Sequence, residues 1–296
     1  MALIELEPPR TLPRGHHSVR SSSAGSAGCV LAARLSEDPG TKVLLLEAGP
    51  TDWHPFVHMP AGLAKLVGDK GVNWDYNTEP EAQLGGRRLW WPRGKVLGGS
   101  SSINAMCYIR GHRRDYDEWD ELGATGWYWD NVLPYFRRSE GNTRGQTRLH
   151  NDKGPLAVSD PRHSNPLSAV FVEAAAQAGH ELTDDFNGEY QDGFGWYQTT
   201  TRLGARASTA EAFLKPARKR KNLTVVTGAL ASRVVFDGKR ASGVEYSVRG
   251  KKQNASARRE VLLSGGALNS PQLLMDRALG IPTKDWLGVE TDESHD

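Results

Sequence analysis

The chain has few cysteines, almost no excess charge of either sign and no long hydrophobic run. Its 296 residues include two cysteines, which are too few for a disulfide framework and lack the spacing of a metal site. Basic and acidic residues number 37 and 35, so the net charge of +2 gives no reason to expect a nucleic acid partner. No stretch approaches the roughly 20 apolar residues of a membrane span. These absences favour a globular protein without a metal, long enough for two domains of ordinary size.

Glycine, by contrast, is abundant, with 32 residues. The densest cluster lies between Arg93 and Asn104, where three glycines and three serines share one short stretch. Backbone without side chains approaches a ligand closely and offers N–H groups to anionic oxygens. The stretch therefore suits a polyphosphate cofactor or a flat polar ring, although a Gly/Ser cluster alone is equally typical of a flexible turn.

A second glycine pattern lies upstream. Ser23-Ala-Gly25-Ser-Ala-Gly28 leads into a helix-like run at 29–35, and residues 42–47 then predict a buried parallel strand that ends in Glu47. In dinucleotide folds an acidic residue at about this spacing binds a ribose hydroxyl, and the helix N-terminus binds the pyrophosphate. Cys29 in this helix and Cys107 in a segment that begins at residue 105 are both predicted to be small core residues.

The start of this pattern is irregular. The fingerprint G-x-G-x-x-G requires glycine where this chain has Ser23, and that glycine makes the tight turn out of the first strand. Residues 11–22 contain no apolar run that would fill the centre of a parallel sheet. We therefore expect residues 1–22 to be an atypical leader and the first strand of the sheet to be missing.

The sequence around the Gly/Ser cluster is more specific. Trp-Trp-Pro-Arg at 90–93 precedes it, and Tyr-Ile-Arg-Gly at 108–111 and Gly126-Trp127 follow it. This ordered set closely resembles the first signature of the glucose–methanol–choline family of FAD-dependent oxidoreductases, in its choline and primary-alcohol dehydrogenase branch. Residues 262–275 resemble the first part of the family's second signature, and the resemblance stops after Met275.

The resemblance implies an α/β fold: an FAD-binding, Rossmann-like, doubly wound parallel-sheet domain and the beginning of an α+β substrate domain, truncated. The implied organisation is an atypical leader at 1–22, a first part of the FAD-binding domain at 23–150, a start of the substrate domain at 151–213, a return to the FAD-binding domain at 214–283 and an acidic tail at 284–296. The implied FAD-binding residues are Ser23, Gly25, Ser26, Gly28, Glu47, Ala48, Val96, Gly99, Ser100, Asn104, Ala105, Met106, Cys107 and Ala231.

The resemblance also implies the chemistry. Family enzymes oxidise an alcohol by passing a hydride to the flavin, and some hold the flavin covalently through a histidine where this chain has Ile103, so we expect FAD to be bound non-covalently. The family's catalytic histidine lies near its far C-terminus, a region that this sequence does not contain, and His295 in the acidic tail is a poor substitute. We therefore assign no catalytic residue and no metal ligand, and expect the chain as written not to oxidise alcohols.

Three hypotheses follow: an FAD-dependent alcohol dehydrogenase, an inactive fragment or splice form, and a nicotinamide-dependent dehydrogenase suggested by Glu47 and the glycines alone. The expected partners are a small alcohol and an electron acceptor that the sequence does not identify, with neither nucleic acid nor a membrane span. We expect a cytoplasmic protein, with mitochondria as the alternative compartment.

Overall fold

The structure is a computed structural model that describes residues 19–21 and 23–275, and these residues form two compact units. Within the described residues, the first unit comprises 19–57, 62–104 and 209–275, and the second comprises 58–61 and 105–208. The predicted domain boundaries differ from this division, because residues 105–150 belong to the second unit rather than remaining with the first part of the FAD-binding domain. Their helices build a separate apolar core around Tyr116 and Trp129, and this core holds them in the second unit.

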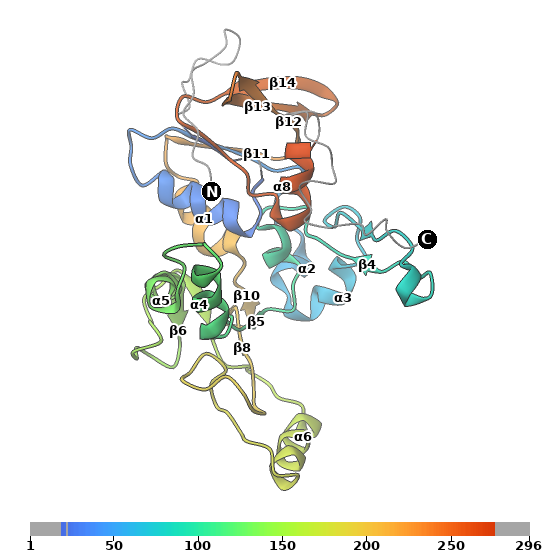
Figure 1. Ribbon diagram of the computed structural model, residues 1–296, viewed down its shortest axis with the longest axis vertical. Helices are drawn as coiled ribbons and strands as arrows, with labels where there is room; N and C mark the ends of the chain where they lie inside the picture. Colours follow the sequence, from blue (N-terminus) through green and yellow to red (C-terminus); the bar gives the residue numbers. More distant parts are fainter. Residues whose placement is uncertain (1–18, 22, 276–296) are drawn as a thin grey trace. The chain divides into compact units, whose positions relative to one another are not determined.

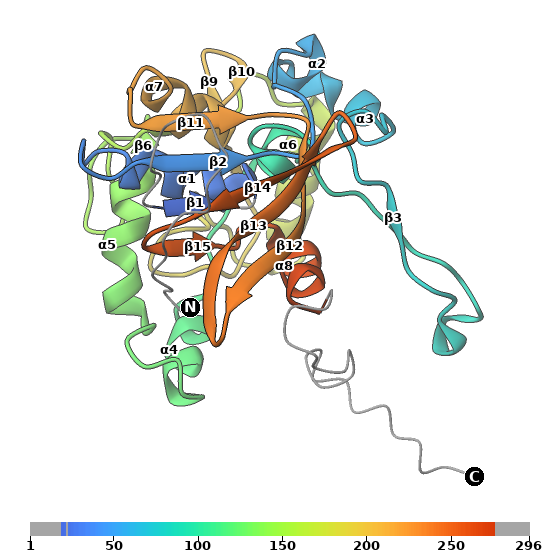
Figure 2. The same ribbon diagram turned by 90° about the horizontal axis from the view of Figure 1, so that it is seen from above.

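A four-stranded parallel sheet forms the centre of the first unit (Figures 1 and 2). Its strands are β1 (Val19–Ser21), β2 (Val43–Leu46), β11 (Leu223–Val226) and β15 (Glu260–Leu262), in the order β11-β2-β1-β15. All four residues of β2 are buried, as predicted for this segment. The doubly wound, parallel α/β fold expected from the sequence is therefore confirmed.

The prediction that the first strand is missing was wrong. Val19–Ser21 pairs in parallel with β2 on one side and with β15 on the other, with Arg20 opposite Leu44 and Val261. Pairing uses backbone N–H and C=O groups, so three residues suffice once both neighbouring strands supply partners. A search for an apolar run does not detect so short a strand.

Two layers cover the sheet (Figures 1 and 2). On one face lies α1 (Ser26–Leu35), which buries Cys29, Ala32 and Ala33. On the other face lies an antiparallel meander of β12 (Ala229–Asp237), β13 (Arg240–Val248) and β14 (Lys251–Ser256). Leu44 and Leu46 of β2 belong to the apolar core that the sheet shares with the meander. The helix predicted at 29–35 is confirmed as part of α1, which begins at Ser26.

The remaining elements of the first unit are short. They are α2 (Pro55–His58, whose last residue is counted with the second unit), η1 (Pro60–Gly62, counted mainly with the second unit), α3 (Leu63–Leu66), β3 (Tyr76–Asn77), η2 (Ala82–Leu84), β4 (Trp90–Trp91), η3 (Gly99–Ser102), the π-helical turn η4 (Ala210–Leu214), α7 (Lys215–Ala217) and α8 (Gly266–Met275). β3 and β4 pair as an antiparallel hairpin in which Tyr76 lies opposite Trp91. In the basic cluster at 218–221 that follows α7, Arg220 donates hydrogen bonds to the Ala33 carbonyl and to Ser36 at the C-terminal end of α1.

The second unit contains three helices and several short strand pairs. They are β5 (Cys107–Tyr108), α4 (Arg113–Glu121), α5 (Trp129–Ser139), β6 (Glu140–Asn142), β7 (Leu156–Val158), α6 (Pro166–Gln177), β8 (Gln198–Thr199), β9 (Thr201–Arg202) and β10 (Ala205–Arg206). In the segment 193–200 only Gln198–Thr199 forms a strand, and Gly193 has a positive φ of 131° that a regular strand does not accommodate.

The prediction for one of the two cysteines was wrong. Cys29 is fully buried, as expected, but Cys107 is exposed. Cys107 lies on β5, which pairs only with the two-residue strand β8, and no apolar layer covers its side chain. The residue types around Cys107 do not encode how little of this segment the fold covers.

Candidate functional site

The two glycine-rich segments lie against each other in the first unit. The N–H of Gly98 donates to the carbonyl of Ala24 at 2.8 Å. The hydroxyl of Ser26 donates to the Gly98 carbonyl at 3.3 Å and accepts from the N–H of Ser101 at the same distance. The loop before η3 is therefore joined to the N-terminus of α1 by hydrogen bonds across more than 70 residues of sequence.

Glycine is required at this contact for two reasons. Gly99 has φ +53°, in the left-handed region that side chains rarely adopt. A Cβ on Gly99 would also lie 2.7 Å from the Cα of Gly25, closer than two such carbon atoms approach. Gly94, the first glycine of the cluster, has the same constraint: a Cβ on it would overlap the backbone of Gly99. The spacing of the glycines thus reflects backbone packed on backbone.

A cavity of about 850 Å³ opens at this contact. That volume lies within the range of cofactor and ligand sites, roughly 300–1,000 Å³. Its walls come from the N-terminus of α1, the loop before η3, the base of the β3–β4 hairpin, β12 and α8. The lining residues are Ser23, Gly25, Ser26, Ala27, Ala48, Trp74, Tyr76, Arg93, Gly94, Gly99, Ser100, Leu230, Ala231, Ser232, Leu263, Ser264, Gly265, Gly266, Ala267, Leu268, Asn269, Ser270, Gln272 and Leu273.

The structure brings half of the predicted site residues together at this cavity. Those that line it are Ser23, Gly25, Ser26, Ala48, Gly99, Ser100 and Ala231. Gly28, Glu47, Val96 and Asn104 belong to the same unit but do not line the cavity. The last three, Ala105, Met106 and Cys107, belong to the second unit. A direct role in cofactor binding stays a prediction for all fourteen.

Glu47 lies just behind the cavity wall and is only 3 % exposed. Its carboxylate accepts hydrogen bonds from the backbone N–H groups of Ala24, at 3.1 Å, and Gly49, at 2.9 Å. Burial raises the pKa of Glu47 to about 7, although these hydrogen bonds act in the opposite direction. The carboxyl group therefore joins the segment after β1 to the end of β2, whether or not it also reaches a ribose.

Ile103 is the residue from which the sequence analysis predicts non-covalent binding of FAD. Its side chain is 4 % exposed and packs with Val57, Leu66, Val72 and Val96 in an apolar cluster. It does not line the cavity. The side chain at this position is thus unreactive and also lies away from the cavity.

The electrostatics of the cavity suit an anion. The first turn of α1 contains no acidic side chain, and the first N–H groups of an α-helix have no partner within the helix. Among the described lining residues only Arg93 carries a charge, and it is positive. A pyrophosphate with flat rings on either side matches this set of backbone donors, one guanidinium and aromatic walls, so the residues present fit FAD.

Several lining residues were not predicted from the sequence. Trp74, Tyr76 and Arg93 come from the hairpin and its base, and residues 263–273 come from the turn after β15 and from α8. The second group lies in the segment 262–275, whose resemblance to the family's second signature was noted in the sequence. In the structure β15 is parallel to β1, so the turns after both strands meet at one edge of the sheet. The signal for the aromatic pair lies in long-range packing that local pattern does not encode.

Catalytic and metal-binding groups are scarce here. None of the described lining residues is His, Asp, Glu or Lys. No group of three or more potential ligands that could hold a metal occurs in the described part of the chain. His295 lies outside the described residues. The helices that the structure describes include none with the length and apolar character needed to cross a membrane.

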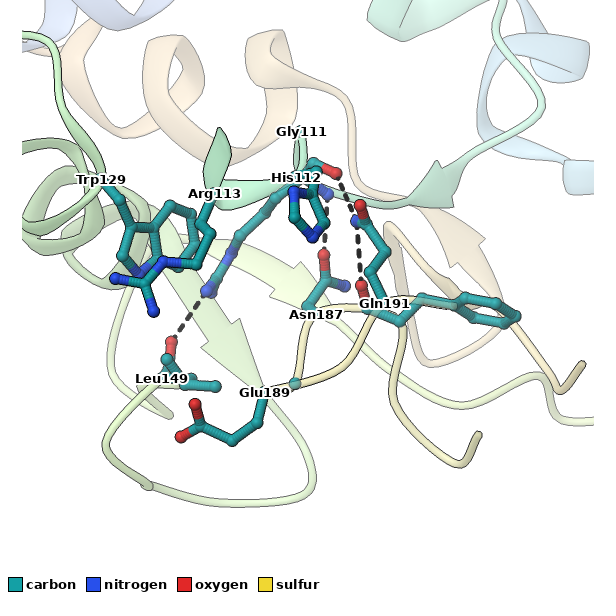
Figure 3. A pocket seen from close by; sticks show the side chains of 11 residues that line it. Gly111, His112, Arg113, Trp129, Leu149, Asn187, Glu189 and Gln191 are labelled. Atoms are coloured by element: carbon teal, nitrogen blue, oxygen red, sulfur yellow. Dashed lines mark hydrogen bonds between the residues drawn. The ribbon is translucent and has the colours of Figure 1, made fainter. Parts of the chain in front are cut away.

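A second pocket, in the second unit, is too small for a dinucleotide. It measures about 30 Å³, which is room for a water molecule or two. Asn187 accepts from the N–H of Arg110 and Gln191 donates to the Arg110 carbonyl at this pocket (Figure 3). Arg110 also belongs to a buried polar cluster that was not predicted from the sequence: Glu140 pairs with both Arg110 and His150, and His150 also pairs with Asp185.

Comparison with known proteins gives consistent results. The family described as GMC oxidoreductase matches residues 21–291. Choline dehydrogenase, mitochondrial, from Homo sapiens is 50% identical over 276 residues, which cover 90% of this chain and 46% of that protein. Alcohol dehydrogenase [acceptor] from Pseudomonas putida is 48% identical, covering 87% of this chain and 47% of that protein. Pyridoxine 4-oxidase from Mesorbium loti has a similar structure, with a TM-score of 0.84 at 37% identity, covering 88% of this chain and 51% of that one. The chain spans about half the length of the curated relatives it matches.

Proposed function

Because this chain belongs to the GMC oxidoreductase family, we propose that its first unit binds FAD non-covalently and serves the oxidation of a small alcohol to an aldehyde. The observation that carries the proposal is the cavity where the N-terminus of α1 meets Gly99 and Ser100. The chain contains the part of the family that binds FAD.

Each wall of the cavity has a distinct task in this proposal. The N-terminus of α1 binds the pyrophosphate through its backbone N–H groups and the helix dipole. Arg93 neutralises part of the phosphate charge. The Gly99–Ser100 backbone lines the flavin and stabilises the negative charge that accumulates on it. Ala231 meets the adenine through its backbone, which explains why a small side chain suffices there.

When bound, FAD supplies the acceptor for the hydride that leaves the carbinol carbon. A general base must take the proton of the alcohol hydroxyl, and positioned bases contribute about 10²–10⁴-fold to such reactions. The described cavity residues hold no carboxylate, imidazole or amine for this purpose. They account for binding and orienting the cofactor, and the base must come from a group that they do not provide.

Choline or a primary alcohol is the proposed substrate class. Two kinds of relatives support it by their names: choline dehydrogenases and an alcohol dehydrogenase [acceptor]. The names differ in the electron acceptor, since some relatives are called oxygen-dependent, so the acceptor is left open in this proposal. Purified protein assayed with FAD, an artificial dye acceptor and either choline or a medium-chain primary alcohol tests the substrate class. Dye reduction that requires choline or the primary alcohol would support it, whereas FAD binding without alcohol-dependent dye reduction would support the inactive fragment that the absence of a base among the described cavity residues leads us to expect.

The cytoplasm is the proposed compartment, with mitochondria as the alternative. The human and mouse relatives carry a mitochondrial location in their names, whereas the bacterial ones do not. Fractionation of cells that express the chain distinguishes the two.

The cofactor proposal is tested by binding. Equilibration with FAD, removal of free flavin and acid denaturation should release all yellow colour into the filtrate, since Ile103 offers no atom for a covalent link. Gly99→Ala should lose FAD, because its Cβ overlaps Gly25 and displaces the loop from α1.

A matched control separates this overlap from backbone strain. Gly238 has φ +59°, and a Cβ on it would have no atom within 4 Å. Gly238→Ala therefore costs only the roughly 1–2 kcal/mol of placing a side chain on left-handed backbone. Equal FAD affinity in the two variants would contradict the proposed site. Flavin that stays with the precipitated protein would contradict non-covalent binding.

A further inference from the structure

Two aromatic rings lie parallel at the wall of the cavity. The ring centroids of Trp74 and Tyr76 are 5.8 Å apart and their planes differ by 7°. Both residues line the cavity and both are half-buried. No part of the cofactor has yet been assigned to either ring, and a parallel aromatic pair is suited to a flat ring ligand.

The backbone between the two rings is unusual. Asp75 has φ +56°, a left-handed conformation that is uncommon for a residue with a side chain. Its carboxylate accepts from the indole N–H of Trp90 at 2.7 Å and pairs with Lys70 at 2.9 Å. These contacts hold Asp75 in place, and with it the orientation of the rings on either side.

Both rings are also fixed from outside the hairpin. The ammonium group of Lys95 lies 4.9 Å from the centroid of the Trp74 ring. The hydroxyl of Tyr76 accepts a hydrogen bond from the amide of Asn269 on α8 at 2.7 Å. The pair is thus held between the loop before η3 and α8, in a preorganised arrangement.

The position of the pair indicates which end of the cofactor it meets. The backbone of Lys95 packs so closely on Gly49 that a Cβ there would overlap it. Gly49 follows Ala48 at the C-terminal end of β2, and Ala48 lines the same cavity. In dinucleotide folds the adenosine lies at this end of the second strand. The rings are therefore linked through Lys95 to the adenosine end.

We propose that the rings of Trp74 and Tyr76 form a platform for the adenine of FAD. The inference rests on the proposed function and adds a specificity element to it: a site that selects a cofactor with a purine ring. Stacking on an aromatic side chain requires only a flat π-face, which a purine supplies without any charge.

The test compares FAD with ADP, which has the adenine and pyrophosphate but no flavin. Dissociation constants are measured on the full 296-residue chain by titration calorimetry, with ADP also competed against FAD. Trp74→Leu and Tyr76→Leu should weaken both ligands by the same factor, about 5- to 150-fold for a lost base–aromatic stack. Tyr76→Phe keeps the ring and removes only the bond to Asn269, so its loss should be much smaller.

Trp53→Leu is the matched control, because Trp53 belongs to the same unit, is 74 % exposed and lies outside the cavity lining. Far-ultraviolet circular dichroism and melting temperature establish that each variant is folded. Weaker FAD binding with unchanged ADP binding would overturn the proposal and assign the rings to the flavin. Unchanged binding of both ligands, or ADP that does not displace FAD from the parent chain, would also overturn it. Failure of the parent chain to bind FAD would refute the proposed function itself, a result separate from any variant.

Discussion

The carboxyl group of Glu47 couples pH to the stability of the first unit. Burial raises its pKa to about 7, against about 4.3 in an unfolded chain. Between these values the folded state binds more protons than the unfolded state, so the free energy of unfolding falls as pH rises. The contribution of Glu47 to stability is fully present below about pH 4.3 and is lost as pH rises through about 7.

Replacing Glu47 by Gln should remove this pH dependence. Between pH 5 and pH 8 we expect the parent to lose roughly 2–3 kcal/mol more unfolding free energy than the variant. This figure follows from about 1.4 kcal/mol for each unit of pKa shift. Urea denaturation at the two pH values measures it, with the exposed Glu81→Gln as control. A pH slope that is the same in Glu47→Gln and the parent would show that the carboxyl titrates normally.

His150 in the second unit has a pH dependence in the same direction, but at higher pH. Burial lowers its pKa, but hydrogen bonds to Asp185 and Glu140 outweigh this effect and raise the pKa to about 9. The contribution is fully present below the unfolded value of about 6.5 and is lost as pH rises through 9. We expect the parent to lose roughly 2–3 kcal/mol more than His150→Gln between pH 7 and pH 10. Thermal denaturation at the two pH values measures the loss, with the exposed His163→Gln as control. If His150→Gln and His163→Gln lose the same unfolding free energy, the prediction is contradicted.

At the scale of elements, β1 has only three residues and lies between two neighbouring strands of the central sheet. Its three residues pair with β2 and with β15. Proline at Arg20 would remove a backbone donor from a central strand and fix φ, at a cost of about 3 kcal/mol or more.

Arg20→Pro should therefore unfold the first unit or lower its melting temperature sharply, whereas Arg20→Val keeps the backbone donor and should not. Circular dichroism on heating distinguishes the two. A proline variant as stable as the valine variant would mean that β1 does not form in solution.

The sequence predicts elements well where the pattern is local. The buried strand at Val43–Leu46 and the helical run at 29–35 within α1 follow from the apolar pattern of these segments. β1 was missed because its stability comes from two partners far away in sequence. The exposure of Cys107 was missed because burial depends on what covers a strand.

The same distinction holds for the site. Gly25, Gly99 and Ser100 were predicted because their glycine and serine spacing is a local signature. Trp74 and Tyr76 were missed because their place at the cavity depends on a left-handed Asp75 and a contact with Asn269, almost 200 residues away. The polar cluster around Glu140 was missed because its histidine and carboxylates are scattered along the sequence.

For the whole molecule, every lining residue of the large cavity belongs to the first unit. A ligand that binds only the folded state stabilises it by about 2.7 kcal/mol at 100 times its dissociation constant. FAD at that concentration should slow amide hydrogen exchange in α1, in the loop before η3 and in α8, and should leave α5 and α6 unchanged. Mass spectrometry of exchanged peptides measures this. Protection confined to the second unit would contradict binding of FAD at the large cavity of the first unit.

The pairing of β1 with β15 also has a consequence for synthesis on the ribosome. The second unit lies almost entirely within one continuous stretch, 105–208, but the central sheet is complete only when Glu260–Leu262 has emerged. At 5–20 residues per second, the edge of β1 that later pairs with β15 remains open for roughly 12–50 s. An open strand edge in a nascent chain is a site for mispairing with other chains. The yield of folded protein should therefore depend on translation speed and on chaperones that shield the nascent chain, and more steeply for the first unit than for the second.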